Sequence, residues 1–162
     1  MPYHPITKQI TDLLQKEHCW FATFEHEPVR TSEEAARVRI GYSLHQGAKA
    51  MVIKAKGPTF GEKFVMLVMP ADLRFDNEKV KTILSAKETR FATEAEIAEI
   101  TGGVQIGGVP PFGNLFKLEV LADPTLFTNE KIVFNAGDRS FSVAMNSADY
   151  RRLVGPVVAK IT

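Results

Sequence analysis

The sequence predicts an α+β fold with a mixed, largely antiparallel sheet and flanking helices. Two apolar runs, at 49–55 and 64–69, are separated by Lys56-Gly-Pro-Thr-Phe-Gly61, a segment typical of a hairpin turn. Helical patterns occur irregularly among the expected strands, which argues against a doubly wound parallel sheet. With 162 residues, 44% of them apolar, the chain can bury a substantial core, so we expect residues 1–162 to form one domain.

The first 41 residues are expected to contain a helix, a strand and a second helix. Apolar residues recur every three or four positions over 5–17, the spacing of an amphipathic helix. Residues 20–26 alternate and are rich in aromatic side chains, which predicts a strand. Thr31-Ser-Glu-Glu34 is a capping box, in which the threonine hydroxyl accepts a backbone N–H and the last glutamate reaches back. A short helix should therefore run to about Arg39 and close at Gly41.

The middle of the chain is expected to contain the hairpin and two short helices. The strand at 64–69 is apolar on both faces and should therefore lie in the centre of the sheet. Residues 76–84 have the pattern of a helix with a charged outer face. A second capping box, Thr93-Glu-Ala-Glu96, should open another helix that ends at Thr101, with Gly102 as its C-terminal cap.

The last third of the chain is expected to consist mainly of strands. Three of them are predicted at 115–121, 131–134 and 141–145. Asn135-Ala-Gly-Asp-Arg139 joins the second and third of these and is rich in residues that tolerate positive φ. Ser147 can cap a final helix through Leu153, and a terminal strand is expected at 157–161.

The stretch from Thr101 to Gly113 has an unusual composition, with five of the eleven glycines and two of the nine prolines. Its glycines allow positive φ or a close approach to a ligand, and its prolines fix φ, so the loop should be tight and stiff. Such a loop can hold backbone N–H groups toward an anion or a carbonyl oxygen. A tight connection into the next strand is the simpler alternative. Because the stretch follows a helix and precedes a strand, it is neither a dinucleotide-binding fingerprint nor a P-loop.

Composition excludes several classes of function. The 20 basic and 19 acidic residues give a net charge of +1, so no overall field attracts nucleic acid, and DNA binding is not expected. Cys19 is the only cysteine, which rules out an internal disulfide and a multi-cysteine metal site. No stretch reaches the roughly 18 apolar residues of a membrane span, and residues 1–11 lack the apolar core of a signal peptide. We therefore expect a cytoplasmic protein without membrane contact.

The histidines give little support for metal or acid–base chemistry. His4, His18, His26 and His45 have none of the spacings of common metal sites, so neither a metal nor a cofactor is expected. His26 stands at a strand end and could act as a general base, although a surface histidine explains it as well. No Gly-x-Ser-x-Gly motif supports a serine hydrolase.

Two basic residues are candidates for binding phosphate. Lys49 opens a strongly apolar strand directly after Gly47-Ala48, and a lysine at a strand entrance beside a glycine is a suitable point charge for a phosphate. A solvated lysine at a sheet edge is the plain alternative. Arg139 could likewise bind phosphate, or it could pair with Asp138 or Asp149.

Several motifs occur together and in a characteristic order. They are Thr31-Ser-Glu-Glu-Ala-Ala36, Lys49-Ala-Met-Val-Ile-Lys54, the glycine–proline stretch 102–113, Phe134-Asn-Ala-Gly-Asp-Arg139, Ser142 and Asp149-Tyr150. In this combination the chain resembles the YbaK and prolyl-tRNA synthetase editing domain family, which includes free-standing trans-editing deacylases. The resemblance runs from about Trp20 to the C-terminus. Its most specific parts are the glycine–proline stretch and the Asn-Ala-Gly turn.

The resemblance implies an α+β fold and hydrolysis of the ester that joins a wrong amino acid, a small one such as alanine or cysteine, to the 3′ end of a tRNA. It implies that Lys49 contacts the terminal adenosine region and that the loop 107–111 holds the aminoacyl carbonyl, with Gly107 and Gly108 as the catalytic backbone groups. A ribose hydroxyl of the tRNA is implied to assist the attacking water, with no metal or cofactor. The implied substrate-binding residues are Thr31, Val109, Pro110, Pro111, Phe112, Asn135, Gly137 and Arg139. The partner would be the acceptor end of a mischarged tRNA, and an aminoacyl-tRNA synthetase could supply further tRNA affinity.

Two other hypotheses stay open. A non-catalytic module of the same fold would bind tRNA ends or nucleotides without turnover, and Ala50, where family members often carry threonine or asparagine, is the feature that favours it. A metal-dependent hydrolase on an unrelated α+β fold would lose activity with a chelator, although the histidine spacing argues against it.

Overall fold

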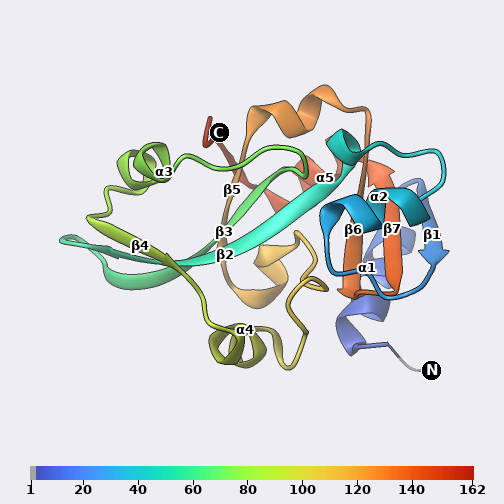
Figure 1. Cartoon of the computed structure of the whole chain (residues 1–162), viewed down its shortest axis with the longest axis horizontal. Coiled ribbons are helices and arrows are strands. Elements are labelled where there is room, and N and C mark those ends of the chain that lie inside the picture. The colour runs from blue at the N-terminus through green and yellow to red at the C-terminus, as the bar shows by residue number, and fades with distance from the viewer. Residues whose placement is uncertain (1–2) are drawn as a thin grey trace.

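The computed structural model describes residues 3–162 and, within them, divides the strands between two sheets (Figure 1). One sheet is antiparallel, with the order β1 (Phe21–Glu25), β7 (Phe141–Asn146), β6 (Lys131–Asp138). The other is mixed, with the order β4 (Glu88–Phe91), β2 (Ala48–Gly57), β3 (Gly61–Pro70), β5 (Glu119–Ala122), β8 (Val157–Val158). The predicted α+β class is confirmed, but two sheets replace the single sheet expected from the sequence.

Helices surround these sheets and join their strands. The α-helices are α1 (Pro5–Lys16), α2 (Ser32–Val38), α3 (Asn77–Leu84), α4 (Glu94–Thr101) and α5 (Ser147–Val154), and short 3₁₀ helices span Leu44–Gln46, Gly113–Phe116 and Pro124–Thr128. Each α-helix lies where the sequence predicts one, within about two residues. Across residues 3–162, no helix combines the length and the apolar character that a membrane crossing requires.

The helix caps follow the sequence signals closely. At α4 both halves of the capping box form, because Thr93 Oγ1 accepts from the Glu96 N–H at 3.1 Å and the Glu96 carboxylate accepts from the Thr93 N–H at 2.9 Å. Gly102 ends that helix at φ +72°, as predicted. At α2 the threonine half forms, but the Glu34 carboxylate accepts from the Arg30 N–H instead of reaching the cap residue itself.

β2 and β3 form the longest strand pair of the larger sheet, and they confirm the hairpin predicted from the sequence. Its register runs without interruption from Ala48 opposite Pro70 to Gly57 opposite Gly61. β3 is central, as expected, because it pairs with β2 on one side and runs parallel to β5 on the other. β4 pairs only with the second half of β2, at Ile53–Lys56. The first half of β2 therefore keeps one edge free of any strand of the same sheet.

Four expectations about strands need correction. β4 was not expected, because its side chains are mostly exposed and carry little apolar signal. The strand expected at 115–121 is a 3₁₀ helix followed by β5, since Lys117 adopts φ +60° and breaks the extended chain. The strand expected at 157–161 ends at Val158. The turn expected at 135–139 belongs largely to β6, which continues to Asp138 across a bulge.

Alternate residues of β2 face two different cores. Val52 joins the first core, which lies between the two sheets and includes Phe134 of β6. Ile53 joins the second core on the other face of the larger sheet, together with Val80 of α3. Because side chains of a strand alternate between faces, the even and odd positions of β2 border different environments. The beginning of β2, ahead of its pairing with β4, is where open space reaches both faces.

Candidate functional site

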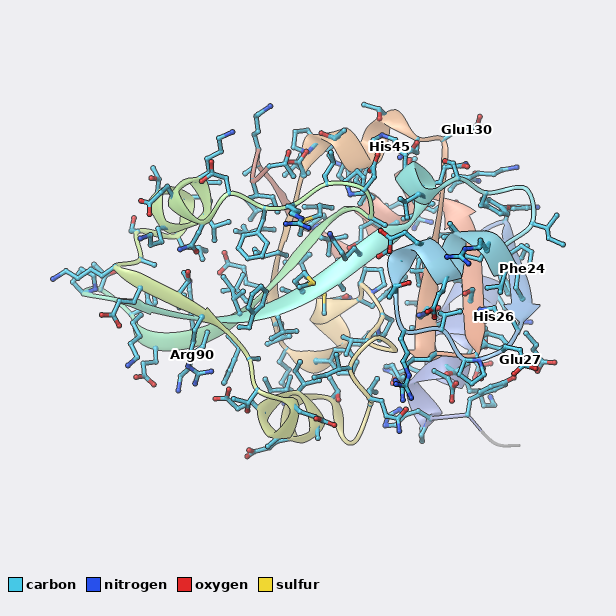
Figure 2. The ribbon with its side chains drawn as sticks, viewed as in Figure 1. Phe24, His26, Glu27, His45, Arg90 and Glu130 are labelled. Carbon is cyan, nitrogen blue, oxygen red and sulfur yellow. The ribbon has the colours of Figure 1, made fainter. Side chains whose placement is uncertain are left out.

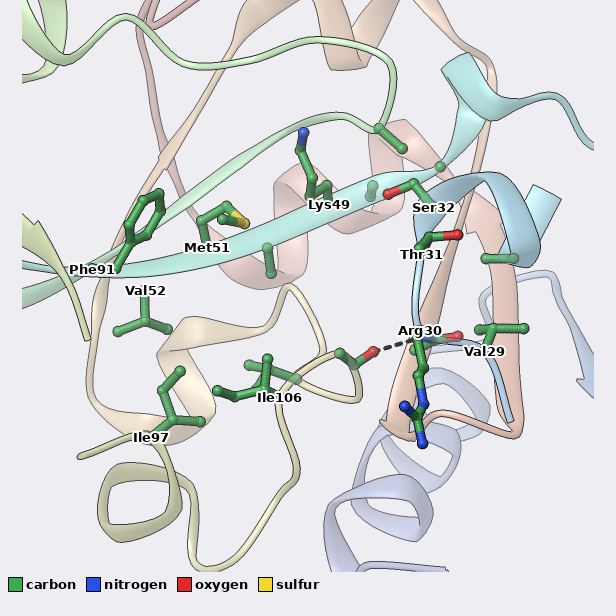
Figure 3. A pocket seen from close by; sticks show the side chains of 18 of the residues that line it. Val29, Arg30, Thr31, Ser32, Lys49, Met51, Val52, Phe91, Ile97 and Ile106 are labelled. Atoms are coloured by element: carbon green, nitrogen blue, oxygen red, sulfur yellow. Dashed lines mark hydrogen bonds between the residues drawn. The ribbon is translucent and has the colours of Figure 1, made fainter. Parts of the chain in front are cut away.

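A cavity of about 400 Å³ opens beside the first half of β2 (Figure 3). Its walls come from the start of α2, residues 47–52, the rim of β4 with α4 and the loop at 106–109, together with Ala71 and Asn135. Met51, Val52, Ile97 and Ile106 give it an apolar lining. We call this cavity the first pocket.

The first pocket brings together five of the residues predicted from the sequence. Its lining includes Thr31, Lys49, Gly107, Val109 and Asn135. Thr31 and Lys49 come from the first third of the chain, whereas Asn135 lies on β6, so only the fold makes them neighbours. The remaining predicted residues do not line it.

Gly107 and Gly108 have different surroundings, which corrects the expectation that both present free backbone groups. Gly107 is exposed at φ +91°, and within residues 3–162 its N–H has no hydrogen-bond partner. Gly108 is buried, its N–H donates to the Gln105 carbonyl at 2.9 Å, and its carbonyl accepts from the Gly137 N–H at 2.8 Å. Gly108 therefore has no backbone donor left for a substrate.

The prolines and the phenylalanine that follow Gly108 belong to the core, contrary to their expected place in a binding site. Pro110, Pro111 and Phe112 are buried, and Phe112 is fully so. The Pro111 carbonyl accepts a hydrogen bond from the Tyr150 hydroxyl at 2.6 Å. The Phe112 ring lies 5.6 Å from the rings of both Phe134 and Tyr150. These residues hold the loop from behind and are not in a position to touch a ligand in the first pocket.

The Asn-Ala-Gly turn supports the loop from the other side. Asn135 Nδ2 donates to the Gly107 carbonyl at 2.7 Å, and Arg139 Nη2 donates to Gln105 Oε1 at 2.7 Å. Gly137 adopts φ +99°, where a Cβ would come within 2.4 Å of Ile6, so glycine is required there. Gly137 and Arg139 thus fix the loop without lining the first pocket, whereas Asn135 does both.

Arg39 is a pocket residue that the sequence reasoning missed. Its side chain is only 6% exposed, and within residues 3–162 it forms no ion pair with a carboxylate. Its Nε donates to Ser142 Oγ at 2.9 Å and its Nη2 to Asn135 Oδ1 at 2.8 Å. Burial lowers the pKa of the guanidinium to about 10, so it stays charged at neutral pH. Its sequence context, the end of a short helix, does not distinguish it from a surface arginine.

The free nitrogen of Arg39 is directed to the pocket side. Among the described residues Nη1 makes no hydrogen bond, and a Cβ on Gly47, another lining residue, would lie 3.7 Å from it. Ser142 Oγ, the partner of Nε, also contacts His26 Nε2 at 2.8 Å. A continuous polar chain therefore leads from His26 through Ser142, Arg39 and Asn135 to the loop.

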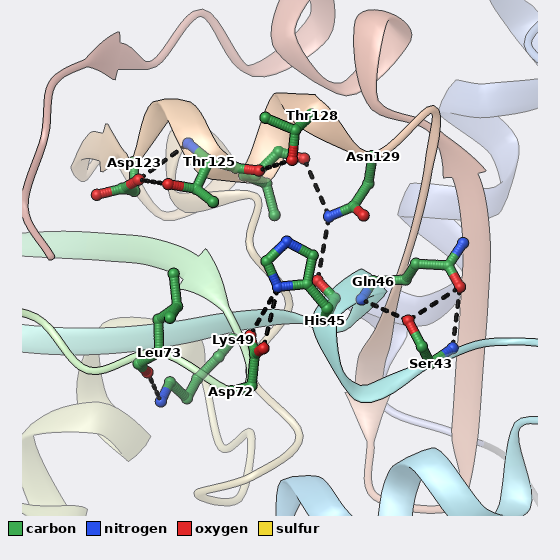
Figure 4. Close-up of polar contacts among 11 residues, drawn as sticks. Ser43, His45, Gln46, Lys49, Asp72, Leu73, Asp123, Thr125, Thr128 and Asn129 are labelled. Atoms are coloured by element: carbon green, nitrogen blue, oxygen red, sulfur yellow. Dashed lines mark hydrogen bonds and ion pairs between the residues drawn. The ribbon is translucent and has the colours of Figure 1, made fainter.

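Lys49 lies at the rim of the first pocket with its ammonium pointing away from Ile106 (Figure 3). Its Nζ donates to the Leu73 carbonyl at 2.6 Å, which leaves two N–H groups for a ligand (Figure 4). Burial lowers the pKa of this lysine below its ordinary value, and the charge of Arg74 lowers it further, whereas Asp72 and Glu33 act in the opposite direction.

The first pocket offers positive charge and hydrogen-bond donors but few proton acceptors. Its lining contains no aspartate, glutamate, histidine or cysteine among the described residues. His26, which the sequence offered as a possible general base, does not line the pocket. It contacts Ser142 of β7, at the opposite end of the molecule from Arg90 on β4 (Figure 2). In the part of the chain that the structure describes, no three His, Cys, Asp or Glu side chains stand close enough to hold a metal ion.

Comparison with known proteins gives a consistent result. The family model of the aminoacyl-tRNA editing domain matches residues 26–153. The multifunctional Ser/Thr-tRNA deacylase ProXp-y of Escherichia coli (strain K12) is 36% identical over 150 residues, which cover 92% of this chain and 88% of that protein. The proline–tRNA ligase of Bacillus licheniformis is 37% identical over 99 residues, 60% of this chain but 16% of the ligase. A crystal structure of a candidate trans-editing enzyme for prolyl-tRNA synthetase has the same fold, with a TM-score of 0.81, 24% identity and 99% coverage of both chains.

Proposed function

The chain belongs to the aminoacyl-tRNA editing domain family, and from that premise we propose that it deacylates mischarged tRNA, with the ester group bound in the first pocket. In this reaction water attacks the carbonyl carbon of the ester, the carbon–oxygen bond to the ribose breaks, and the ribose oxygen leaves as a hydroxyl. The protein has to stabilise the negative charge that develops on the carbonyl oxygen.

The observation that carries this proposal is the pairing of two unused donors in one cavity. The Gly107 N–H and Arg39 Nη1 both belong to residues that line the first pocket, and neither has a partner within residues 3–162. Donors fixed before the reaction stabilise an oxyanion without reorganisation, and loss of one such donor typically costs about 2.7–4 kcal/mol. We assign the carbonyl oxygen of the ester to the space between these two groups.

Arg39 supports an anionic transition state for a second reason. A buried cation without a carboxylate partner costs several kcal/mol of desolvation, on the order given for isolated buried ions. In the free protein, the neutral oxygens of Ser142 and Asn135 compensate only part of that cost. A developing oxyanion would supply the missing negative charge, so the stabilisation would be greatest in the transition state.

We assign Lys49 to the nucleotide that carries the ester. Its two remaining N–H groups can bind a phosphate or a ribose oxygen at the rim of the pocket, which would position the substrate without transferring a proton. Asn135 holds the peptide between Gly107 and Gly108 through the Gly107 carbonyl, directly after the peptide that carries the Gly107 N–H. Val109 and Met51 give the acyl group an apolar wall.

The described residues around the first pocket offer the attacking water few groups that could accept its proton. The described lining of the first pocket lacks carboxylates, imidazoles and thiols. This supports a mechanism in which a ribose hydroxyl of the tRNA assists the water, as the family resemblance implies. A tRNA ending in 2′-deoxyadenosine would then be bound but hydrolysed slowly.

The acyl group is expected to be small. Alanine and cysteine are the amino acids implied by the family resemblance, and the Escherichia coli relative is named for serine and threonine. The hydroxyl-bearing residues Thr31 and Ser32 line the pocket together with Arg39, a polar set that suits a hydroxyl side chain. We therefore place seryl and threonyl esters first and alanyl and cysteinyl esters second.

Deacylation of a panel of mischarged tRNAs tests the proposal. Wild-type protein is expected to hydrolyse at least one of the Ser, Thr, Ala and Cys esters. Lys49→Ala should lower kcat/KM about 100-fold, which corresponds to about 2.7 kcal/mol of lost positioning.

Lys54→Ala is the matched control for that variant. Lys54 lies on the same strand but pairs with Glu62 at 2.9 Å outside the first pocket, so its variant should stay within about twofold of wild type, as surface ion pairs contribute little. Binding of tRNA without hydrolysis of any ester would indicate a non-catalytic module and would refute the proposal. A chelator should leave the rate unchanged.

A further inference from the structure

A second cavity, of about 550 Å³, adjoins the first pocket across the free edge of β2. It is lined by Met51 and Ile53 of β2, by residues 74–77 and by Thr89, Arg90 and Phe91 of β4, with Lys49 at its border. Lys49, Met51 and Phe91 line both cavities. We call this cavity the second pocket. A ligand too large for the first pocket can therefore extend into the second without leaving the protein surface.

The second pocket holds two cations, Arg74 and Lys49, that form no ion pair within residues 3–162, although Asp72 and Glu33 act on the pKa of Lys49 in the opposite direction to Arg74. Arg74 is exposed and, within residues 3–162, makes neither a hydrogen bond nor an ion pair. Its charge is close enough to Lys49 to lower the pKa of that lysine. Arg90, in contrast, is held by two contacts of 2.7 and 2.9 Å with Glu96. Arg74 and Lys49 together thus form a pair of repelling cations that an anion such as phosphate would stabilise.

The segment that carries Arg74 is anchored on both sides, so the cation pair is built into the fold. Lys49 Nζ donates to the Leu73 carbonyl, and Asp72 accepts from His45 at 2.9 Å (Figure 4). On the other side, the Asp76 N–H donates to the Ile161 carbonyl at 2.6 Å. The Asp72 carboxylate is therefore engaged by His45, and the backbone around Arg74 is fixed.

Phe91 supplies the second pocket with an exposed aromatic surface. Its side chain is 57% exposed although it is a large apolar residue. Phe75 supports it edge to face, with ring centroids 5.8 Å apart at 74°. Exposed aromatic rings beside cations are the usual means by which proteins bind unpaired nucleic-acid bases, the rings by stacking and the cations through phosphate. Asn77, whose side-chain oxygen accepts a hydrogen bond from Thr89, keeps its side-chain N–H groups for the edge of a base.

We propose that the second pocket is a nucleotide subsite, in which the base of the substrate's 3′-terminal nucleotide stacks on Phe91 and its 5′ phosphate lies between Arg74 and Lys49. The ribose then lies at the rim shared by the two pockets, and the ester on that ribose enters the first pocket. This inference rests on the proposed deacylation. It adds Arg74 and Phe91 as residues that bind and position the substrate.

Kinetics of the proposed reaction provide the first test. Phe91→Ala should raise KM about 5- to 100-fold, the equivalent of about 1–3 kcal/mol of base stacking, with kcat within about twofold. Phe91→Tyr keeps the ring and should restore KM. Trp20→Ala is the matched control, because Trp20 is also exposed and also lies beside a lysine, Lys131, but outside both pockets. Its KM should equal that of wild type.

Binding of uncharged RNA tests the subsite independently of hydrolysis. Intact tRNA and tRNA lacking its terminal adenosine are titrated with wild type and Phe91→Ala, and fluorescence anisotropy gives Kd. The truncation and the substitution should each weaken binding about tenfold, and together no more than either alone, because both remove the same contact. Arg74→Gln should reduce the slope of log Kobs against log salt by about 0.7, the value for one phosphate contact on a single strand.

The possible results separate the subsite from the deacylation. Hydrolysis with an unchanged KM in Phe91→Ala and Arg74→Gln would overturn the subsite and leave the deacylation intact. Absence of hydrolysis together with Phe91-dependent binding of the tRNA end would overturn the deacylation and support the subsite. Equal Kd values for intact and truncated tRNA would overturn the subsite in either case. Competition with AMP distinguishes a site for the tRNA end from a site for free nucleotide, since a site for free nucleotide would bind AMP as tightly as it binds the tRNA end.

Discussion

The two pockets on either side of β2 differ in how their polar groups are held. In the first pocket, Arg39 is buried and hydrogen-bonded at Nε and Nη2, and Asn135 holds the carbonyl of Gly107. In the second pocket, Arg74 and Phe91 are exposed side chains on anchored segments. Groups needed in the transition state have to be aimed in advance, whereas groups that only bind a remote part of the substrate can stay in water. The difference predicts that changes in the first pocket lower kcat and changes in the second raise KM.

The largest effect is expected from Arg39. Arg39→Met fills a similar volume but removes the donor, and kcat should fall about 100- to 1,000-fold with little change in KM. Ser142→Ala removes the partner of Nε while keeping the guanidinium, and should lower kcat less than about tenfold, as loss of one ordinary hydrogen bond would.

Added guanidinium ion separates a chemical from a structural role of Arg39. Millimolar guanidinium should restore part of the kcat of Arg39→Met and leave its unfolding temperature unchanged. If Arg39→Met loses activity only because it unfolds, thermal denaturation will show it and no rescue will occur. An Arg39→Met protein that is folded and retains wild-type kcat would contradict the role assigned to Nη1.

An intermediate effect is expected from Gly107→Ala. An alanine at φ +91° is strained by about 1–2 kcal/mol, and the loop can relieve that strain by rotating the peptide whose N–H we assign to the ester carbonyl. We expect kcat to fall about tenfold, with a loss of stability no larger than that strain.

Gly108→Ala provides the comparison for that variant. Its Cβ would lie 3.3 Å from the Asp138 backbone, which cannot move aside as a side chain can. Urea denaturation should therefore show a larger loss of stability than for Gly107→Ala. Wild-type kcat in Gly107→Ala, with a stable fold, would show that the Gly107 N–H takes no part in the reaction.

The sequence predicts those features that local signals determine. The capping box at Thr93 and the hairpin of β2 and β3 are examples, because each depends on residues within about twenty positions of one another. β4 was missed because its strand character comes from pairing with Ile53–Lys56 and hardly from its own composition. A short exposed edge strand has little apolar pattern to detect.

The residues around the first pocket were predicted less completely than the fold, because most of them are brought together by contacts between distant parts of the chain. Glycines at 107 and 108 look alike in the sequence, and only the contact with Gly137 shows that the second one faces inward. Arg39 is held at the first pocket by Asn135 and Ser142, which are 96 and 103 positions away. Lys49, which lines the first pocket, was a candidate from the sequence because its position at a strand entrance is a local feature.

Substitution of Asp123 should have the smallest effect on activity. It therefore tests whether the activity changes expected in the two pockets come from lost contacts with the substrate or from a general loss of stability. Its carboxylate is fully buried outside both pockets and accepts hydrogen bonds from Thr125, Ile161 and Thr162. Burial alone would raise its pKa, but these hydrogen bonds lower the pKa to about 2. The unfolded chain, with an aspartate pKa of about 3.9, binds the proton more tightly, so protonation favours unfolding.

The stability that Asp123 contributes, about 2 kcal/mol, should be present above pH 4 and lost as the pH falls through about 2. Urea denaturation at pH 5, 4 and 3 should show that the difference in free energy of unfolding between wild type and Asp123→Asn shrinks as the pH falls. The free energy of unfolding of Asp12→Asn, a change at an exposed carboxylate, should follow that of wild type. At pH 7 Asp123→Asn should keep kcat and KM within about twofold, because a variant that is still mostly folded presents both pockets unchanged. If Asp123→Asn instead lowers kcat as Arg39→Met does, loss of stability alone would explain the activity changes, and the distinction between the pockets would fail.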